Sequence, residues 1–335
     1  MVLPAGRRLQ SGVAPMRVFL IGATGVLGRE LVRQFVARGD AVVGSVRSER
    51  GQQLLASLGA EPRPVEVLDA EALTRAGAEC EVVIHAATAI PDKFRPRGRD
   101  WEANDRLRRQ GTQALVQCAR RIGARAYLQQ SIVWLAAPPE GGFYDEDSPA
   151  HPDRITQSAL DGEQLALEAA GSSGFQSMVL RCGMFYGPEA RHTRQMADLL
   201  RQRRFPVVGQ GTGLLPLLHV QDAAGAFVTA AQTPRTGRWH IVDEEPAELR
   251  LFLEAFARQL GAPPPRRIPL WLARWIAGRD ATQLLTAASH TSNRRFRQDF
   301  SWSPRYPTFR QGLQQIIEQW RKQPAGGPSP PALGS

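Results

Sequence analysis

The sequence predicts an α/β protein with a doubly wound parallel sheet of the Rossmann type and a smaller, mainly helical C-terminal lobe. From residue 16 to residue 181, short apolar runs alternate with stretches that have apolar residues at helical spacing, as in successive βα units. Helical patterns dominate after residue 247. With 42% hydrophobic and 22% charged residues, the chain has the composition of a folded globular protein.

The first βα unit carries the most informative motif. Residues 16–21 form a short run of branched and aromatic residues, which predicts a buried strand, and residues 26–38 have helical spacing. The turn between them is glycine-rich, so that a pyrophosphate could approach the backbone and be stabilised by the first-turn amides and the helix dipole. In this strand–turn–helix context, the motif predicts a dinucleotide site formed by Gly22, Thr24, Gly25, Val26, Leu27 and Gly28.

The alternation continues through the first half of the chain. Further strands are predicted over 41–46, 64–68, 81–86, 126–130 and 177–181. Helices are predicted over 52–58, 70–78, 101–122 and 156–170. Right-handed crossovers between such strands would place helices on both faces of the sheet and ligands at the carboxyl ends of the strands.

The pattern becomes looser after residue 183. Helices are expected over 196–203, 221–231, 247–260, 270–277, 294–300 and 309–321, with a strand over 239–242. We therefore expect an N-terminal disordered extension or mis-assigned start (1–15), a nucleotide-binding domain (16–235, of which 183–213 contributes to the substrate lobe), a C-terminal substrate lobe (236–321) and a disordered tail (322–335).

Composition excludes several partners. The formal charge is +10, but the basic residues are dispersed along the chain, so no specific nucleic-acid partner is expected. No apolar run approaches the roughly 18–20 residues that span a bilayer, so no membrane partner is expected. Cys80, Cys118 and Cys182 form no Cys-x-x-Cys pair and are interpreted as buried, reduced thiols of a cytoplasmic protein. The six histidines show no zinc-type spacing, so no metal is expected.

The end of the second predicted strand bears on the choice of coenzyme. Sites for NAD usually place a carboxylate there, about 20 residues past the glycine motif, to bind the ribose 2′-hydroxyl. This chain has Val46 and Arg47 at that place and Arg50 soon after. A guanidinium favours a 2′-phosphate through paired, charge-assisted hydrogen bonds. We therefore predict NADP as the preferred coenzyme, with NAD as the alternative.

Several landmarks occur in one order along the chain. They are the glycine motif, Val83-Ile-His-Ala-Ala87, Gln130-Ser131, Arg181 with Tyr186-Gly-Pro188, His219-Val-Gln-Asp222, and the closing segments 292–293, 300–304 and 306–312. In combination this set resembles the extended short-chain dehydrogenase/reductases, the NAD-dependent epimerase/dehydratase family. The resemblance covers roughly residues 16 to 320 and implies a homodimer formed through helices 101–122 and 156–170.

The resemblance also assigns roles to single residues. It implies that Ala86 and Ala87 border the cofactor ribose and that Glu66 lies near the adenine, where an exposed strand-end glutamate is the alternative. Ser131 matches the family's active-site serine, or it simply caps a strand end. Tyr186 would face the substrate, or it is a packing aromatic.

A second landmark is structural in the family. The resemblance implies that His219 and Asp222 tie a loop to the start of a helix, with Asp222 as the cap.

One family feature is missing. The family uses Tyr-x-x-x-Lys, in which the spacing of four places the proton-transferring phenol and the lysine on one helical face. Here Ile155 and Ala159 fall at those positions, and none of the four tyrosines has a lysine four residues on. We therefore predict an oxidoreductase that moves hydride between NADP(H) and a small carbonyl or hydroxyl substrate, with non-standard proton transfer. Epimerase or dehydratase chemistry is a variant of this prediction, and a non-catalytic, NADP-bound sensor or scaffold is the alternative.

Overall fold

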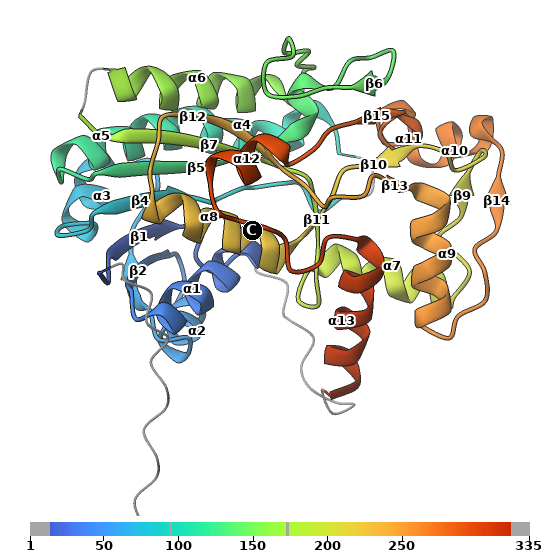
Figure 1. The fold of residues 1–335 in the computed structure, drawn as a ribbon, viewed down its shortest axis with the longest axis horizontal. Helices are drawn as coiled ribbons and strands as arrows, with labels where there is room; N and C mark the ends of the chain where they lie inside the picture. Colours follow the sequence, from blue (N-terminus) through green and yellow to red (C-terminus); the bar gives the residue numbers. More distant parts are fainter. Residues whose placement is uncertain (1–13, 94–95, 172–173, 323–335) are drawn as a thin grey trace, which may run out of the picture.

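The fold is built on a parallel β-sheet covered by helices on both faces, as Figure 1 shows for the computed structural model, which describes residues 14–93, 96–171 and 174–322. The sheet has seven strands in the order β12-β7-β5-β4-β1-β2-β3, and every pair of neighbours is parallel. Its strands are β1 (Arg17–Ile21), β2 (Ala41–Val46), β3 (Glu61–Pro64), β4 (Val82–His85), β5 (Ala126–Ile132), β7 (Gln176–Cys182) and β12 (Gly237–Ile241). The predicted doubly wound α/β fold is confirmed.

Two hydrophobic cores sandwich this sheet. One core lies between the sheet and α1 (Val26–Arg38), α2 (Glu49–Ser57), α8 (Val220–Gln232) and α12 (Arg294–Asp299). The other lies against α3 (Ala70–Ala76), α5 (Thr112–Arg121) and α6 (Gln157–Gly171). The single helix predicted over 101–122 is divided by a wider π-helical turn, which separates α5 from α4 (Glu102–Arg106). Both sheet faces are therefore buried, which explains why the strands read as continuous apolar runs.

A third core holds the C-terminal lobe together. It joins α7 (Arg191–Arg201), α9 (Leu249–Gln259) and α13 (Phe309–Lys322) with the short strands β9 (Val207–Val208), β10 (Leu214–Leu215) and β13 (Ala247–Glu248). The lobe also contains β14 (Arg267–Ile268), α10 (Leu270–Ala277) and α11 (Arg279–Thr286). Two further parallel pairs connect it to the sheet domain: β8 (Met184–Tyr186) with β11 (Leu217–His219), and β6 (Gly142–Phe143) with β15 (Ser289–His290).

Two expectations about strands were wrong. The third strand occupies 61–64 instead of 64–68, because β3 is an edge strand whose charged and proline residues show no apolar pattern. The boundary at 235/236 is also wrong, since β12 pairs in parallel with β7 and completes the main sheet. The expected terminal extension (1–15) and tail (322–335) lie outside the described residues, except for 14–15 and Lys322, which ends α13.

Two buried carboxylates join the sheet domain to the lobe. Asp243 lies two residues after the end of β12. It accepts hydrogen bonds from the Tyr186 hydroxyl (2.8 Å) and the His219 amide (3.1 Å). Asp222 accepts hydrogen bonds from the amides of Arg305 (2.6 Å) and Tyr306 (2.9 Å). The sequence predicts Asp222 as the cap of its own helix, and this prediction is wrong.

The cap of α8 is His219, whose ring nitrogen accepts from the amide of Gln221. Asp222 instead holds the segment that leads into α13, because its carboxylate faces the 305–306 backbone.

These carboxylates predict a pH dependence of stability. Burial raises the pKa of Asp222 to about 6 and that of Asp243 to about 7. Between about pH 4, the ordinary pKa, and these values, each of the two carboxyls binds more protons in the folded state than in the unfolded state, so its contribution to the free energy of unfolding falls as pH rises. We expect Asp243→Asn to remove part of this fall, so that the variant gains stability relative to wild type between about pH 5 and pH 8.

Urea unfolding at the two pH values measures the effect. Burial lowers the pKa of His219 to about 4, and the pH dependence that this histidine contributes is common to wild type and variant, so it cancels in their difference. The exposed Asp198→Asn provides the control, for which the difference from wild type should not change with pH. A pH-independent difference for Asp243→Asn would contradict the prediction.

Candidate functional site

The glycine turn lies tightly against the end of β4. Gly22 has φ +86°, a conformation that side-chain-bearing residues rarely adopt, and a Cβ there would lie 2.6 Å from the amide nitrogen of Ala87. A Cβ at Gly28 would lie 2.1 Å from the carbonyl oxygen of Gly22. The structure therefore brings the glycine motif together with Ala86 and Ala87, as the sequence predicts.

The first turn of α1 is open to an anion. Gly25 precedes the helix in an extended conformation (φ −69°, ψ 173°), and no side chain caps the helix. The amides of Val26, Leu27 and Gly28 begin this helix, and such first-turn amides have no partner within the helix. A Cβ at Gly25 would meet one atom within 4 Å, the Gly22 oxygen at 3.2 Å. This turn fits the diphosphate of a dinucleotide, which would take these amides as donors.

Thr24, which is part of the glycine turn, connects the turn to neighbouring elements. Its carbonyl accepts a hydrogen bond from Arg29 Nη1 (3.1 Å), and its methyl group lies 3.3 Å from the Cβ position of Gly51 in α2. Arg29 also donates through Nε to Glu189 (2.9 Å), in the loop after β8. The conformation of the turn is thus tied to both α2 and the loop that leads into the lobe.

Arg47 and Glu66 follow neighbouring strands at the same edge of the sheet. Arg47 is exposed, comes directly after β2 and precedes Ser48, which caps α2 by accepting from the amide of Gly51. Because β2 pairs in parallel with β1, Arg47 lies at the edge where the glycine turn begins. Glu66 is exposed in the turn after β3, where its carbonyl accepts from the Asp69 amide.

Ser131 belongs to a buried ionic cluster. Its hydroxyl donates a hydrogen bond to Glu163 of α6, and Arg181 of β7 donates through Nε (2.9 Å) and Nη2 (2.7 Å) to both oxygens of the same carboxylate. All three residues are buried, with Glu163 and Arg181 fully excluded from solvent. The Ser131 hydroxyl therefore donates its one hydrogen bond to Glu163, and it can act only as a hydrogen-bond acceptor toward another molecule.

Tyr186 is placed as a structural residue. Its ring is buried between Phe252 and His219, in edge-to-face contacts with centroids 6.3 Å and 5.2 Å away. Its hydroxyl donates to Asp243, and burial beside this carboxylate raises the pKa of Tyr186 well above its ordinary value. This placement favours the packing role of Tyr186 over the catalytic one.

Ile155 and Ala159, which the resemblance aligns with the family's tyrosine and lysine, lie around the start of α6. The carbonyl of Ile155 accepts from Arg108 Nη1 (3.3 Å), and Ala159 is buried. Ser158 donates to Asp105 of α4 (2.6 Å) and lies near Arg108. Sequence reasoning missed Arg108, because nothing in the local pattern distinguishes it from the other arginines on exposed helix faces.

His85 is a second residue to which sequence reasoning gave no role. It ends β4, immediately before Ala86, and burial lowers its pKa to about 4, so the ring is neutral near pH 7. Its Nε2 lies 3.4 Å from the Leu107 carbonyl, and its Nδ1 has no partner among the described residues. Its place at a strand end, before the predicted ribose contacts, was the signal that could have found it.

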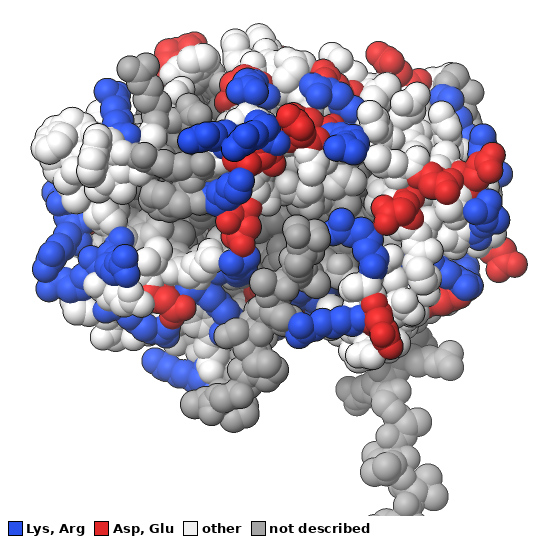
Figure 2. Space-filling model, turned by 180° about the vertical axis from the view of Figure 1, so that it is seen from behind, with Lys and Arg blue, Asp and Glu red and all other residues white. Residues whose placement is uncertain are grey.

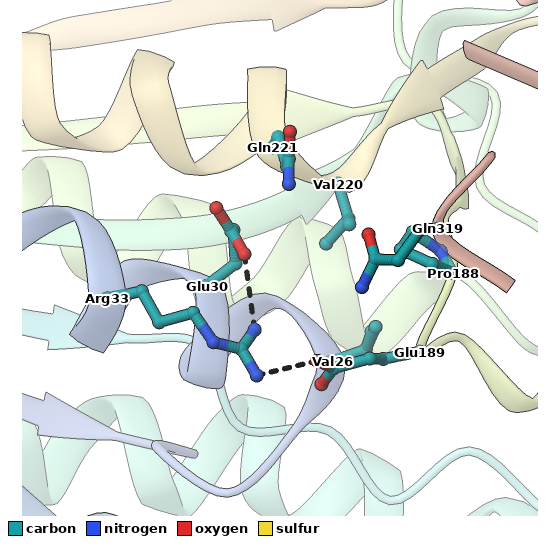
Figure 3. Close-up of a pocket in the computed structure, with 8 residues that line it drawn as sticks. All are labelled: Val26, Glu30, Arg33, Pro188, Glu189, Val220, Gln221 and Gln319. Atoms are coloured by element: carbon teal, nitrogen blue, oxygen red, sulfur yellow. Dashed lines mark hydrogen bonds and ion pairs between the residues drawn. The ribbon is translucent and has the colours of Figure 1, made fainter. Parts of the chain in front are cut away.

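A polar pocket lies beside the glycine turn (Figure 3). It has a volume of about 180 Å³ and is lined by Val26, Glu30, Arg33, Pro188, Glu189, Val220, Gln221 and Gln319. Arg33 binds both Glu189 (2.6 Å) and Glu30 (3.2 Å), so the pocket's acidic groups are neutralised within its wall.

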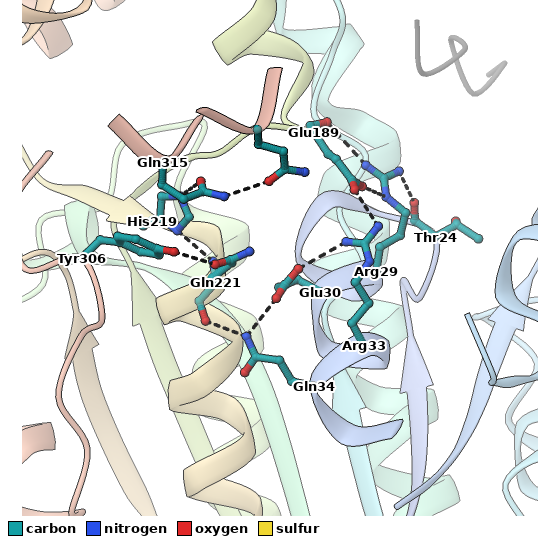
Figure 4. Close-up of polar contacts among 11 residues, drawn as sticks. Thr24, Arg29, Glu30, Arg33, Gln34, Glu189, His219, Gln221, Tyr306 and Gln315 are labelled. Carbon is teal, nitrogen blue, oxygen red and sulfur yellow. Dashed lines mark hydrogen bonds and ion pairs between the residues drawn. The ribbon is translucent and has the colours of Figure 1, made fainter. Parts of the chain in front are cut away.

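Figure 4 shows how these contacts continue into the lobe. Gln34 links Glu30 to the Gln221 carbonyl, and the Tyr306 hydroxyl donates to the side chain of Gln221. The helix that begins at the glycine turn is thereby fixed to the C-terminal lobe.

The expectations for metals, membranes and cysteines concern the described residues as a whole. Within residues 14–93, 96–171 and 174–322, no group of His, Cys, Asp or Glu could hold a metal ion, and no helix could cross a membrane. Cys80, Cys118 and Cys182 are buried and free, as predicted. Basic and acidic side chains are interspersed over the face shown in Figure 2.

Comparison with known proteins identifies the family. A model described as "NAD dependent epimerase/dehydratase family" matches residues 18–242. The chain belongs to this family. Its members use NAD(P), and the predicted Rossmann-type fold and resemblance are confirmed to that extent.

Several relatives are named as reductases, among them the following two. The chain is 38% identical over 308 residues to a 3-diazoavenalumate denitrifying reductase of a Streptomyces species, covering 89% of this chain and 99% of the relative. It is 31% identical over 244 residues to a 4-hydroxy-2-methyl-3-oxo-4-farnesyl-3,4-dihydroquinoline-1-oxide ketoreductase of Stigmatella aurantiaca, covering 71% of each.

Solved structures share the fold at lower identity. The human epimerase family protein SDR39U1 with NADPH has a TM-score of 0.75 at 21% identity, covering 90% of this chain and 99% of that one. A UDP-glucose 4-epimerase from Thermotoga maritima has a TM-score of 0.76 at 17% identity, covering 92% and 99%.

The glycine turn predicts a substitution that affects binding and spares folding. Gly25→Val suits the extended backbone at this position and meets little protein, but its branched side chain would cover the uncapped first turn of α1. We expect affinity for NADPH and NADH to fall by about 100-fold or more. Isothermal titration calorimetry measures the loss, with Gly171→Ala, at an open helix end, as the control. Unchanged affinity would refute the site.

The buried ion pair predicts a loss of stability. Glu163→Gln keeps the shape of the side chain but leaves the Arg181 charge buried without its counter-charge, at a cost of roughly 3–5 kcal/mol. Urea unfolding measures the difference from wild type. The exposed Glu168→Gln on the same helix is the control and should change stability by less than about 0.5 kcal/mol. A loss for Glu163→Gln as small as the control's would show that the pair contributes little.

Proposed function

We propose that this protein is an NAD(P)H-dependent reductase, with NADPH preferred, that delivers hydride to an electron-poor substrate without a Tyr–Lys proton donor. The substrate class that we propose is a diazo compound in its arenediazonium form. When bound, the coenzyme supplies the hydride; the residues of this chain bind and orient the two reactants.

The coenzyme part of the proposal rests on the glycine turn. Its open first turn can bind the diphosphate, and Ala86 and Ala87 can border the ribose because they touch Gly22. Arg47 occupies the place where an NAD site would have a carboxylate, which supports NADPH over NADH.

The observation that carries the proposal is the state of the hydroxyl protons near the site. Ser131 donates its proton to Glu163 and Tyr186 donates its proton to Asp243. Ile155 and Ala159 stand where the family has its Tyr–Lys pair. Reduction of a carbonyl needs a proton on oxygen, and its positioned delivery contributes about 10²–10⁴-fold in rate. A substrate that is already cationic needs no such donor.

An arenediazonium ion meets this requirement, and the Streptomyces relative is named as a denitrifying reductase of a diazo compound. The ion accepts hydride at its terminal nitrogen to give an aryldiazene, which loses dinitrogen as its hydrogen passes to the ring carbon. The sum converts the diazonium ion and NAD(P)H into the arene, dinitrogen and NAD(P)⁺. Electrons and protons balance with no external acid.

Carbonyl reduction is the second candidate, because the Stigmatella relative is named as a ketoreductase. The proton would then come from water or from the coenzyme ribose hydroxyl, as neither Ser131 nor Tyr186 has one to give. This route loses the contribution of a positioned donor and should be slower.

The proposal is tested with the full chain, deuterium-labelled NADPH and two substrate panels, one of arenediazonium salts without hydroxyl groups and one of aldehydes and ketones. We expect NADPH oxidation with the diazonium salts and deuterium in the product arene. Two control reactions, one without protein and one with the Gly25→Val variant, measure the background rate, which is subtracted. Turnover of carbonyl compounds but not of diazonium salts would reject the proposed substrate class in favour of carbonyl compounds. Tight NADPH binding without turnover in either panel would favour a sensor or scaffold.

Coenzyme preference gives a separate prediction. We expect Arg47→Ala to weaken NADPH binding by about tenfold or more, because it removes a charge-assisted contact with the 2′-phosphate, and to change NADH binding by less than about twofold. Calorimetric titration of both coenzymes measures the two constants. Arg63→Ala, an exposed arginine of β3, is the control. Equal losses for the two coenzymes would remove Arg47 from the 2′-phosphate site.

A further inference from the structure

Helix α10 exposes an apolar face to solvent. Trp271 and Trp275 are 70% and 76% exposed, and Leu270 and Ile276 are also exposed. Because the two tryptophans are four residues apart, their rings lie on the same side of the helix. Ala273 is buried and marks the side that faces the lobe. In Figure 1, α10 lies at the outer edge of the lobe, away from α1 and α2.

The segment around α10 is strongly basic. Residues 255–279 contain no Asp or Glu, and they contain five arginines, at 258, 266, 267, 274 and 279. Arg266 and Arg267 are exposed just before the helix, and Arg274 is exposed beside the two tryptophans. A short helix with an exposed tryptophan face and flanking arginines combines the two features that bind proteins to anionic lipid surfaces.

We propose that α10 docks the C-terminal lobe onto the surface of an anionic lipid bilayer. The helix lies in the plane of the interface, with the Trp271 and Trp275 rings at the level of the head groups, where tryptophan is favoured. Arg266, Arg267 and Arg274 face the lipid phosphates. Eight residues of helix are about 12 Å long, far short of the thickness of a bilayer, so the helix lies on the membrane and does not cross it.

Sequence analysis excluded a membrane partner because no apolar run is long enough to span one. That criterion tests for spanning segments and does not test for a surface helix. What the sequence could not show is that both tryptophans of this short apolar stretch remain exposed after the lobe has folded.

Charge favours a bilayer over a second copy of this chain. In a twofold-symmetric dimer the same patch meets itself, so Arg274 and its neighbours would face identical arginines, and the nearest carboxylates along the chain are Glu254 and Asp280, outside 255–279. An anionic bilayer supplies the opposite charge together with an apolar layer for the tryptophan rings.

The test measures co-sedimentation of the full chain with vesicles of phosphatidylcholine, with and without phosphatidylglycerol. We expect binding to the anionic vesicles, weakened by salt and accompanied by a blue shift of tryptophan fluorescence. The double variant Trp271→Ser/Trp275→Ser should lower the partition coefficient by about tenfold or more. Arg266→Gln/Arg267→Gln should weaken binding to anionic vesicles. Leu68→Ser, which removes an exposed apolar side chain elsewhere, should bind as wild type.

Three results would overturn the proposal. They are no binding of the wild type to anionic vesicles, equal binding of the tryptophan variant, and a tryptophan-dependent dimer in sedimentation velocity without vesicle binding. Thermal unfolding shows whether the variants remain folded. Because neither coenzyme nor substrate is present, failure of this test leaves the proposed reductase activity untouched.

Discussion

The close contact between the β1–α1 turn and the end of β4 constrains everything near the proposed coenzyme site. Gly22 can adopt its left-handed conformation and touch the Ala86–Ala87 backbone because it has no Cβ, and Gly28 can approach Gly22 for the same reason. These contacts bring the start of α1 to the carboxyl edge of the sheet. With no capping side chain, its first-turn amides remain directed at that edge. The proposed diphosphate site therefore depends on backbone geometry, before any side chain contributes.

Side-chain protons limit what this site can do. Burial of Glu163 is tolerated because Arg181 supplies a fork of donors to both carboxylate oxygens, and the remaining acceptor capacity takes the proton of Ser131. The same reasoning applies to Tyr186, whose proton is held by Asp243. Each of these two hydroxyl groups therefore donates its hydrogen bond to a buried carboxylate, and neither proton remains for donation to a carbonyl oxygen. This is the basis of our proposal that the substrate accepts hydride without acid assistance.

Sequence reasoning found those parts of the fold in which local pattern and tertiary environment agree. The first βα unit was located because a buried strand, a glycine turn and an amphipathic helix each have a local signature. β3 was misplaced because an edge strand buries too little to show one. β12 was assigned to the wrong domain because pairing with β7 is a contact between distant segments. The cluster around Ser131 was missed for the same reason, since its three members come from three elements.

The side chain of Arg29 connects the proposed coenzyme site to the C-terminal lobe. Arg29 binds the Thr24 carbonyl of the glycine turn and the Glu189 carboxylate of the loop after β8. One side chain on α1 therefore holds the diphosphate-binding turn and the entrance to the lobe in a fixed relation. Asp222 and Asp243 fix the other end of this connection, through the 305–306 backbone and Tyr186. In the proposed reaction, which needs two reactants held in contact, these contacts would contribute by positioning the coenzyme site relative to the lobe.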